Sequence, residues 1–404
     1  MRCTRFAVPA LLAATALLLV ACGGGGGESA AGDPTPLPAQ APPQARAQDD
    51  DRSAAGLPTV LPLNRVVPAR VDGLQALSAT ARSAAVVLSN LVQADGTFWR
   101  PADLITETGF QDFFEAVYTA SSRAGPAVVV LEIIRLADEA GAQRLLDVLR
   151  GQPDRSGTDV ALPAGLDAPR SFADRDVATV ADGPPLLAGQ RLQVASVTTR
   201  DGNVLVRTLV FSDSANALET AADLARSQLA RLAAARAGDL LPPLDLPFPP
   251  IALDAVIARL PAEVQGYARF TSDQDLAGST QYVGPGGAFM LILLQPLQSA
   301  VNAGLLDHRL RQPDVIAGLF ADAGSPIRVL DTALLPQPPP AVAVAERWRV
   351  DLGGTLLFDD LLAFRRGSVW GVLQGLSPDP GGTPLAGLLR VVTAAIDEVR
   401  AGAE

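Results

Sequence analysis

The 404-residue chain contains no lysine, a single histidine (His308) and two cysteines. Without lysine it can form no Schiff base, no phosphate-binding loop of the G-x-x-x-x-G-K type and no Ser-x-x-Lys hydrolase centre. One imidazole cannot build a histidine-based metal site, and no Gly-x-Ser-x-Gly motif is present to accompany it in a triad. We therefore expect a protein that is not an enzyme and that holds no cofactor or metal.

Positive charge is also scarce. The 32 arginines face 43 acidic residues, which gives a formal net charge of −11 and an isoelectric point near 4.7. A nucleic-acid partner would require the opposite sign of charge. An anionic bilayer would likewise repel this surface. We therefore expect no nucleic-acid partner, and no attachment to a membrane through surface charge.

The first residues have the features of an export signal. Arg2 and Arg5 precede an apolar run, 6–20, that is too short to span a bilayer comfortably. The run ends in Leu-Val-Ala-Cys-Gly at 19–23, which resembles the lipobox of bacterial lipoproteins. The resemblance implies that residues 1–21 are removed as a signal peptide. It also implies that the Cys22 thiol receives a diacylglycerol and that the new amino terminus receives a further fatty chain such as palmitate.

Such an anchor has consequences for location and stability. Two or more buried chains hold a protein durably, so we expect an exported protein on the outer face of the cell membrane or on the outer membrane. Its membrane partner would be reached through the lipid on Cys22. Because Cys3 leaves with the signal and Cys22 carries lipid, no cysteine remains for a disulfide. The mature chain, with 30 basic and 43 acidic side chains, must therefore be stabilised by packing.

Residues 22–60 are rich in glycine and proline and contain almost nothing to bury. This composition predicts a disordered tether that lifts the body clear of the headgroups. As a flexible coil it would span on the order of 35 Å. The glycine run at 23–27 is followed by no Lys-Ser/Thr and is not a phosphate-binding loop.

The body contains an internal duplication. An apolar run at 127–136 and another at 288–297 are each followed by a helical pattern and then by Gln-Pro-Asp, at 152–154 and 312–314. Hairpins are predicted downstream of both, at 192–212 and 357–377. The two copies therefore have the same predicted order of elements: strands, a helix and a hairpin.

Glycine occupies the same turn position of both hairpins, Gly202 and Gly367, where a tight reversal needs a positive φ. A terminal helix follows each hairpin, at about 214–236 and 384–400, with one apolar stripe to lay on a sheet. A further amphipathic helix is expected at about 74–92, with a weaker counterpart at 253–260.

These patterns predict an α+β fold with two tandem duplicated domains, each an antiparallel sheet packed against helices on one face and both preceded by the tether. The expected boundaries are 61–238 for the first domain, 239–250 for a proline-rich linker and 251–404 for the second domain. The element layout of each copy resembles exported α+β domains of the PsbP/Mog1 type found in bacterial lipoproteins.

Aromatic residues gather on the strands of the second copy at Trp348, Phe358, Phe364 and Trp370, where several equivalent first-copy positions carry Val, Thr or Arg. They could line a ligand pocket or a docking surface, although core filling explains them as well. Acidic pairs at 359–360 and at 174 and 176 could serve acid and base chemistry or hold calcium. Neighbours on a strand point to opposite faces, so Asp359 and Asp360 are not expected to act together.

Taken together, we expect a non-enzymatic envelope lipoprotein that binds an envelope protein or a small or lipid-like ligand. The alternative is a carrier or assembly factor for an envelope lipid or another apolar ligand, which the continuous apolar runs 128–134 and 289–294 would suit. A third possibility is a hydrolase that uses two converging carboxylates. A deep apolar pocket, a shallow aromatic patch and clustered acids would distinguish these three.

The first prediction concerns the anchor. Replacing the lipid acceptor, Cys22→Ser, should release the protein from membranes, because no other segment of the chain is expected to hold it there. Fractionation of cells and immunoblotting of the membrane and soluble fractions measure this. If the serine variant still sediments with membranes, the lipidation of Cys22 is not the anchor.

Overall fold

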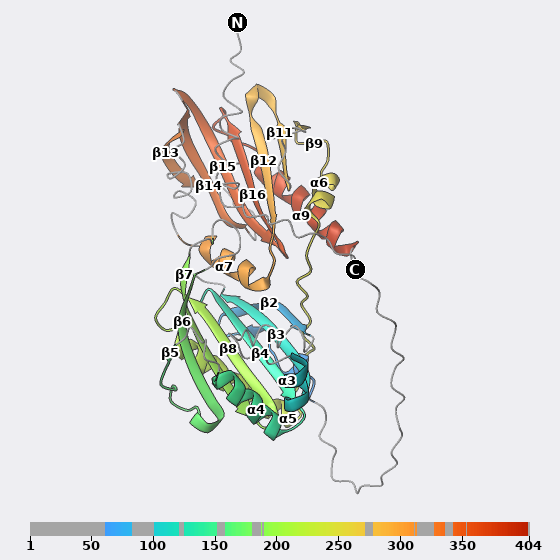
Figure 1. Cartoon of the computed structure of the whole chain (residues 1–404). Coiled ribbons are helices and arrows are strands. Elements are labelled where there is room, and N and C mark those ends of the chain that lie inside the picture. The colour runs from blue at the N-terminus through green and yellow to red at the C-terminus, as the bar shows by residue number, and fades with distance from the viewer. Residues whose placement is uncertain are drawn as a thin grey trace. The chain divides into compact units, whose positions relative to one another are not determined.

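Two antiparallel sheets of eight strands each organise the chain, as the computed structural model shows (Figure 1). The structure describes residues 61–82, 101–120, 125–151, 158–179, 187, 190–270, 278–310, 312, 327–335, 342–352 and 354–402. The predicted signal peptide (1–21) and the whole of the predicted tether (22–60), including the lipid acceptor Cys22, lie outside the described residues. The expectations about export, lipidation and the tether therefore rest on the sequence.

The first sheet has the strand order β1-β2-β3-β4-β8-β7-β6-β5. All of its neighbouring strands pair antiparallel. Its strands are β1 (Arg70–Val71), β2 (Leu74–Ala81), β3 (Phe110–Ala120), β4 (Val128–Leu136), β5 (Thr158–Asp159), β6 (Ser171–Thr179), β7 (Arg191–Asp201) and β8 (Val204–Ser212). Its helices are η1 (Leu63–Arg65), α3 (Pro101–Thr108), α4 (Glu139–Arg150), η2 (Ala168–Arg170) and α5 (Ala217–Arg236).

The second sheet has the order β13-β14-β15-β16-β12-β11-β10-β9. Its strands are β9 (Glu263–Val264), β10 (Tyr267–Phe270), β11 (Ser279–Val283), β12 (Phe289–Pro296), β13 (Ile327–Leu334), β14 (Val342–Leu352), β15 (Thr355–Arg366) and β16 (Val369–Ser377). Its helices are α6 (Leu253–Arg259), η3 (Pro285–Gly287), α7 (Ala300–Leu310) and α9 (Leu385–Ala401).

Read from β9 to β13, the second sheet repeats the strand order of the first, with β9 in the place of β1 and β16 in the place of β8. The α+β fold of two duplicated domains is therefore confirmed. Both hairpins lie where the sequence predicted them, with Gly202 at φ +60° and Gly367 at φ +59° in the turns. Both terminal helices, α5 and α9, follow their hairpins. The predicted boundaries around 239–250 stay a prediction, since Leu63–Glu404 forms one compact unit.

The duplication extends to single hydrogen bonds. Tyr118 of β3 donates its hydroxyl to the Pro68 carbonyl over 2.8 Å, and Tyr282 of β11 donates to the Pro261 carbonyl over 2.8 Å. Each proline opens the same segment, Pro-Ala-x-Val-x-Gly, at 68–73 and 261–266. In both, the residue before the glycine and the glycine itself have positive φ and form the turn between the first two strands. Each buried tyrosine thus fixes this short hairpin to its own sheet.

Helix ends are repeated too. Asp138 caps α4 by accepting from the Gly141 amide at 2.7 Å, and Ser299 accepts from the Asn302 amide at 3.2 Å at the start of α7. Before the terminal helices, Ser212 and Ser377 each accept from the amide two residues later at 3.0 Å. Asp138 and Ser299 satisfy backbone amides that the first turn of a helix leaves free, whereas Ser212 and Ser377 stabilise the turn that precedes each terminal helix.

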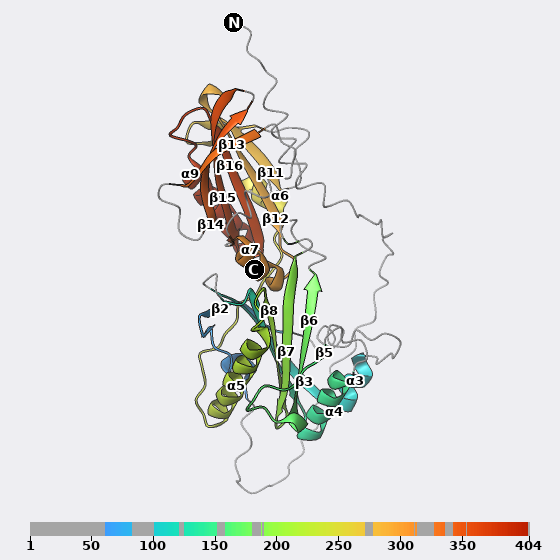
Figure 2. The same ribbon diagram turned by 90° about the vertical axis from the view of Figure 1, so that its left-hand side faces the viewer.

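Helices cover both faces of the first sheet, so the expectation of helices on one face is wrong. On β4, Val129 and Leu131 lie beneath α5, whereas Ile134 and Leu136 pack in the cluster that includes Leu145 of α4. Alternate residues of a strand point to opposite faces, so α5 and α4 lie on opposite faces of this sheet, as Figure 2 shows. Apart from Glu132, the runs at 128–134 and 289–294 are apolar because both faces of each central strand are buried.

The helix expected at 74–92 is also wrong over its described part. Leu74–Ala81 is strand β2, which pairs with β1 and β3; the rest of that prediction, from 83 onward, lies outside the described residues. Leu74 and Ala76 have the spacing of a strand, whereas Leu74, Leu77 and Ala81 have that of a helix. Pairing with two neighbouring strands decides between the two. The counterpart expected at 253–260 is confirmed as α6.

The proline-rich segment between the two copies is attached to the first sheet. Leu246 exchanges two backbone hydrogen bonds with Ala79 of β2, at 2.7 and 2.9 Å. Upstream, the Leu241 and Leu244 amides donate to the carbonyls of Arg65 and Asn64. Among the described residues, none of the helices has the length and apolar character needed to cross a membrane.

The repeated tyrosine bonds yield a stability prediction. Tyr118→Phe and Tyr282→Phe should each destabilise the protein by about 1–2 kcal/mol, because each leaves a proline carbonyl without its donor. The double variant should lose the sum of the two, since the bonds lie in different sheets. Urea unfolding followed by circular dichroism measures this. Unchanged stability in both single variants would mean that these bonds do not hold the two hairpins.

Candidate functional site

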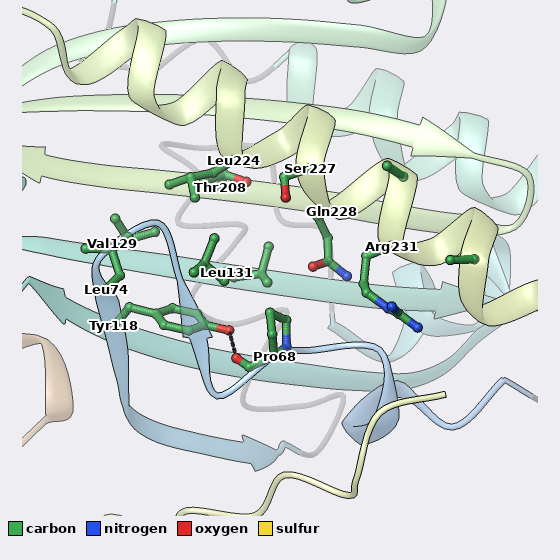
Figure 3. A pocket seen from close by; sticks show the side chains of 13 residues that line it. Pro68, Leu74, Tyr118, Val129, Leu131, Thr208, Leu224, Ser227, Gln228 and Arg231 are labelled. Atoms are coloured by element: carbon green, nitrogen blue, oxygen red, sulfur yellow. Dashed lines mark hydrogen bonds between the residues drawn. The ribbon is translucent and has the colours of Figure 1, made fainter. Parts of the chain in front are cut away.

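A cavity of about 290 Å³ lies between helix α5 and the first sheet (Figure 3). Its wall is built from the segment around β1 and β2, the strands β3, β4 and β8, and one side of α5. The lining residues are Pro68, Val71, Leu74, Tyr118, Val129, Leu131, Thr208, Leu224, Ser227, Gln228, Ala230, Arg231 and Ala234. Ligand pockets in proteins span about 300–1,000 Å³, so this cavity is at the lower limit of that range and suits only a small ligand.

One wall of the cavity is the short segment that leads into β1 and β2. The buried amide of Gln228 donates to the Val66 carbonyl over 3.1 Å, and the Tyr118 hydroxyl donates to the Pro68 carbonyl. These bonds join the segment to α5 and to the sheet respectively, so it bridges the two layers. Ser227 and Ala230 of α5 are exposed, which places the opening of the cavity along this side of the helix.

The floor of the cavity is largely apolar. Figure 3 shows Leu74, Val129 and Tyr118 toward one end and Arg231 at the other, with Thr208, Leu224 and Leu131 in between. Thr208 is fully buried, and its hydroxyl has no hydrogen-bond partner among the described residues. Burial raises the pKa of Tyr118, so its hydroxyl stays protonated and remains a donor.

Arg231 is the one charged side chain among the lining residues. Its Nη1 donates to Asp239 Oδ2 over 3.1 Å. Its Nε and Nη2 are buried and have no partner within the described chain. Buried donors without acceptors are costly and rare in folded proteins. These two atoms have almost no accessible surface, so they do not face the cavity.

The second copy provides an internal comparison. Tyr118 pairs with Val129 across the first sheet as Tyr282 pairs with Met290 across the second. Thr208 lies opposite Leu131, two residues after Val129, and Leu373 lies opposite Ile292, two residues after Met290. Thr208 therefore corresponds to Leu373. In the two Pro-Ala-x-Val-x-Gly hairpins, Leu74 pairs with Val71 and Tyr267 pairs with Val264, so Leu74 corresponds to Tyr267.

The terminal helices are aligned by an arginine near their ends. The Arg236 guanidinium lies against Gly202, and Arg400 lies against Gly367, at the two equivalent turns. This alignment places Val392 at the position of Gln228 and Ala395 at that of Arg231. The polar end of the cavity is therefore absent from the second copy.

At these positions the second copy is filled with apolar side chains. Tyr267, Met290, Leu373, Val392 and Ala395 all belong to one buried hydrophobic cluster beneath α9. Larger or apolar residues thus occupy the places of Leu74, Val129, Thr208, Gln228 and Arg231. The same fold is packed in one copy and opened, with polar groups added, in the other.

The aromatic residues that the sequence singled out are mostly buried. Trp348, Trp370 and Phe364 are each 2% exposed, and Phe358 is half-buried. Phe358 and Phe364 share one face of β15 by strand alternation. Trp348 lies opposite Asp359 and Trp370 opposite Arg365, on the other face. The structure does not bring the four together, and three of them are core residues, so we place the candidate site in the first domain.

The acidic pairs do not converge. Asp360 accepts from Arg347 Nε at 2.6 Å, from Arg347 Nη2 at 3.0 Å and from the Thr383 amide at 2.9 Å. Asp359 faces the other way and accepts from Gln374 Nε2 at 2.8 Å. The expectation that these neighbours cannot act together is confirmed.

The other singled-out polar residues also have neighbours of their own. Asp174 accepts from Ser196 Oγ at 3.2 Å, and the Asp176 carboxylate accepts from the Val177 amide. His308 is buried in α7, with Nε2 3.1 Å from the side-chain nitrogen of Gln312. Over the described part of the chain, no group of three His, Cys, Asp or Glu side chains is placed to hold a metal ion.

Comparison with known proteins yields little. No family model and no curated protein matches the chain. The extracellular domain of PknH from Mycobacterium tuberculosis is similar over 42% of this chain and 87% of its own, at 9% identity and a TM-score of 0.26. DynU16, a putative protein in the dynemicin biosynthetic locus, is similar over 81% of this chain and 96% of its own, at 10% identity and a TM-score of 0.14. At these scores neither likeness supports an argument about function, and the PsbP/Mog1 resemblance stays a prediction.

Sequence reasoning missed Thr208, Gln228 and Arg231. The signal that could have found them is the Arg-Ala-Gly ending shared by both terminal helices, at 236–238 and 400–402. When the helices are aligned on that ending, Gln228 and Arg231 of the first copy correspond to valine and alanine in the second.

Asp359 supplies a prediction about pH. Burial raises its pKa to about 7, whereas the unfolded carboxyl ionises near pH 4. Between these values the native carboxyl holds a proton that the unfolded chain releases, so stability falls as pH rises from about 4 to about 7. Asp359→Asn should remove this pH-dependent loss of stability. At pH 8 the variant should be more stable than the wild type by on the order of a few kcal/mol, since each unit of pKa difference corresponds to about 1.4 kcal/mol. The two proteins should differ least near pH 4.

Urea unfolding at pH 4.5 and pH 8 measures the effect. The neighbouring variant Asp360→Asn is the control and should lower stability at pH 8, because it weakens a buried ion pair with Arg347. An Asp359→Asn variant with the pH dependence of the wild type would contradict the raised pKa.

Proposed function

We propose that this protein is an exported, lipid-anchored binding protein that does no chemistry itself and whose first domain holds a small, largely apolar ligand between α5 and its sheet. The observation that carries the proposal is the cavity of about 290 Å³ at a position that the second copy fills with core side chains. Since both copies share one fold, the fold itself does not require the opening. The sequence of the first copy creates it.

The lining of the cavity favours binding. Its floor includes Leu74, Val129 and Leu131, and its polar groups are few. Binding sites commonly combine apolar walls with a few polar groups that orient the ligand. A catalytic role would require an acid, a base or a nucleophile within the cavity. The acidic pairs considered from the sequence are not among its lining residues.

The size of the cavity favours a small ligand over a two-chain envelope lipid. A cavity of roughly 150 Å³ accepts one benzene molecule, and this one is about twice that volume. The carrier alternative is therefore best supported for a small apolar ligand. The lipid on Cys22, predicted from the lipobox, would hold such a binding domain at the membrane surface.

Native mass spectrometry tests the proposal. The body, residues 61–404, contains every described strand and both sheets. Purified without denaturant from the envelope of its own host, it should carry an excess mass of a small molecule. Thr208→Leu, which introduces the residue of the second copy into the floor of the cavity, should lose that mass while remaining folded. A bare wild-type mass, together with no binding of added apolar compounds, would overturn the proposal.

A further inference from the structure

We infer that the cavity selects an uncharged, apolar molecule that carries a single hydroxyl group, and that Gln228 accepts a hydrogen bond from this hydroxyl. The inference rests on the proposed function and adds the chemical class of the ligand. Alcohols and phenols with a small apolar body belong to that class.

The first step is the unused half of the Gln228 side chain, which lines the cavity and is 4% exposed. Its Nε2 donates to the Val66 carbonyl over 3.1 Å, and because a carbonyl can only accept, this bond fixes which end of the amide is the oxygen. Oε1 has no hydrogen-bond partner among the described residues, and unlike the Thr208 hydroxyl it is not cut off from accessible surface. In Figure 3 it lies on the Leu131 side of the amide. A buried acceptor therefore faces the cavity without a donor.

The second step is the shortage of donors that a ligand could use. Tyr118 gives its hydroxyl proton to the Pro68 carbonyl. Arg231 has its Nη1 paired with Asp239, and its Nε and Nη2 have almost no accessible surface. The Ser227 hydroxyl, on the exposed side of the cavity, can both donate and accept. The lining therefore matches a donor on the ligand better than an acceptor.

The third step excludes a charged head group. A carboxylate would bring only acceptor atoms to the Gln228 oxygen, and the lining offers it no free cationic group. An ammonium would bring donors, but none of the lining residues is acidic. A buried charge without a partner is costly, whereas a hydroxyl satisfies Gln228 Oε1 without that cost.

The fourth step is the internal comparison. In the alignment of the terminal helices, Val391 and Val392 take the places of Ser227 and Gln228. Both valines pack in the apolar cluster of the second sheet. Two adjacent polar residues are therefore not needed at these positions to fold this domain type. They are present in the copy that has the cavity.

Titration calorimetry with three compounds tests the inference on the 61–404 body at pH 7. The compounds are 1-octanol, its isomer heptyl methyl ether, which has no hydroxyl hydrogen, and octanoate, which is charged. Octanol should bind about five- to tenfold more tightly than the ether, because the ether leaves the Gln228 oxygen without a donor. Octanoate should bind at least about tenfold more weakly than octanol.

Variants locate the effect. Gln228→Met removes the acceptor and keeps a side chain of similar length, so octanol should lose its advantage over the ether. Loss of the bond to Val66 would change the binding of both compounds alike, so the ratio of their affinities isolates the hydroxyl. Thr220→Val is the matched control, because Thr220 lies on the same helix but is not among the lining residues. It should keep the wild-type ratio.

The outcomes separate the two proposals. Equal binding of octanol and the ether to the wild type, or an unchanged ratio in Gln228→Met, would overturn the hydroxyl inference and leave the cavity as an apolar binding site. Tightest binding of octanoate would overturn it as well. If Gln228→Met fails to fold, the ranking of the three compounds on the wild type still decides the class of ligand. No binding of any of the three, together with a bare native mass, would overturn the proposed function too.

Discussion

The structure depends on covering both faces of each eight-stranded sheet with apolar side chains. No cysteine remains for a disulfide once Cys3 is cleaved and Cys22 is lipidated, as the lipobox predicts, so burial of apolar surface must stabilise the body. The central strands β4 and β12 are apolar along nearly their whole length, and residues of both faces of each are buried. In the first domain α5 covers one face of the sheet and α4 covers the other. The cavity lies between α5 and the sheet, where the side chains do not fill the space.

The short Pro-Ala-x-Val-x-Gly hairpin determines how that space is bounded. In both domains a buried tyrosine holds it by donating to the proline carbonyl. In the first domain Gln228 adds a second bond from the helix to the same segment. The segment therefore forms a side wall of the cavity, and Leu74, Val129 and Thr208, which are smaller than their second-domain counterparts, leave the volume open. In the second domain tyrosine, methionine and leucine at the equivalent positions fill it.

Duplication makes this comparison informative. Two domains of one chain share a strand order, cap positions and turn glycines, so a difference between them is a difference in side chains and not in fold. The polar differences gather around one cavity. The aromatic differences in the second domain, Trp348, Trp370 and Phe364, are instead explained by packing, since all three are buried.

The sequence alone determined the duplication, the two hairpins with their turn glycines, the terminal helices and the opposed directions of Asp359 and Asp360. Each of these depends on local periodicity or on the φ of a single residue, which the sequence encodes directly. The tertiary structure decided that Leu74–Ala81 is a strand, because pairing with β1 and β3 outweighs an ambiguous apolar pattern. It also decided that helices cover both faces of the first sheet. The candidate site could not be read from the sequence, because Thr208, Gln228 and Arg231 come from different elements and become neighbours of one cavity only when α5 packs on the sheet.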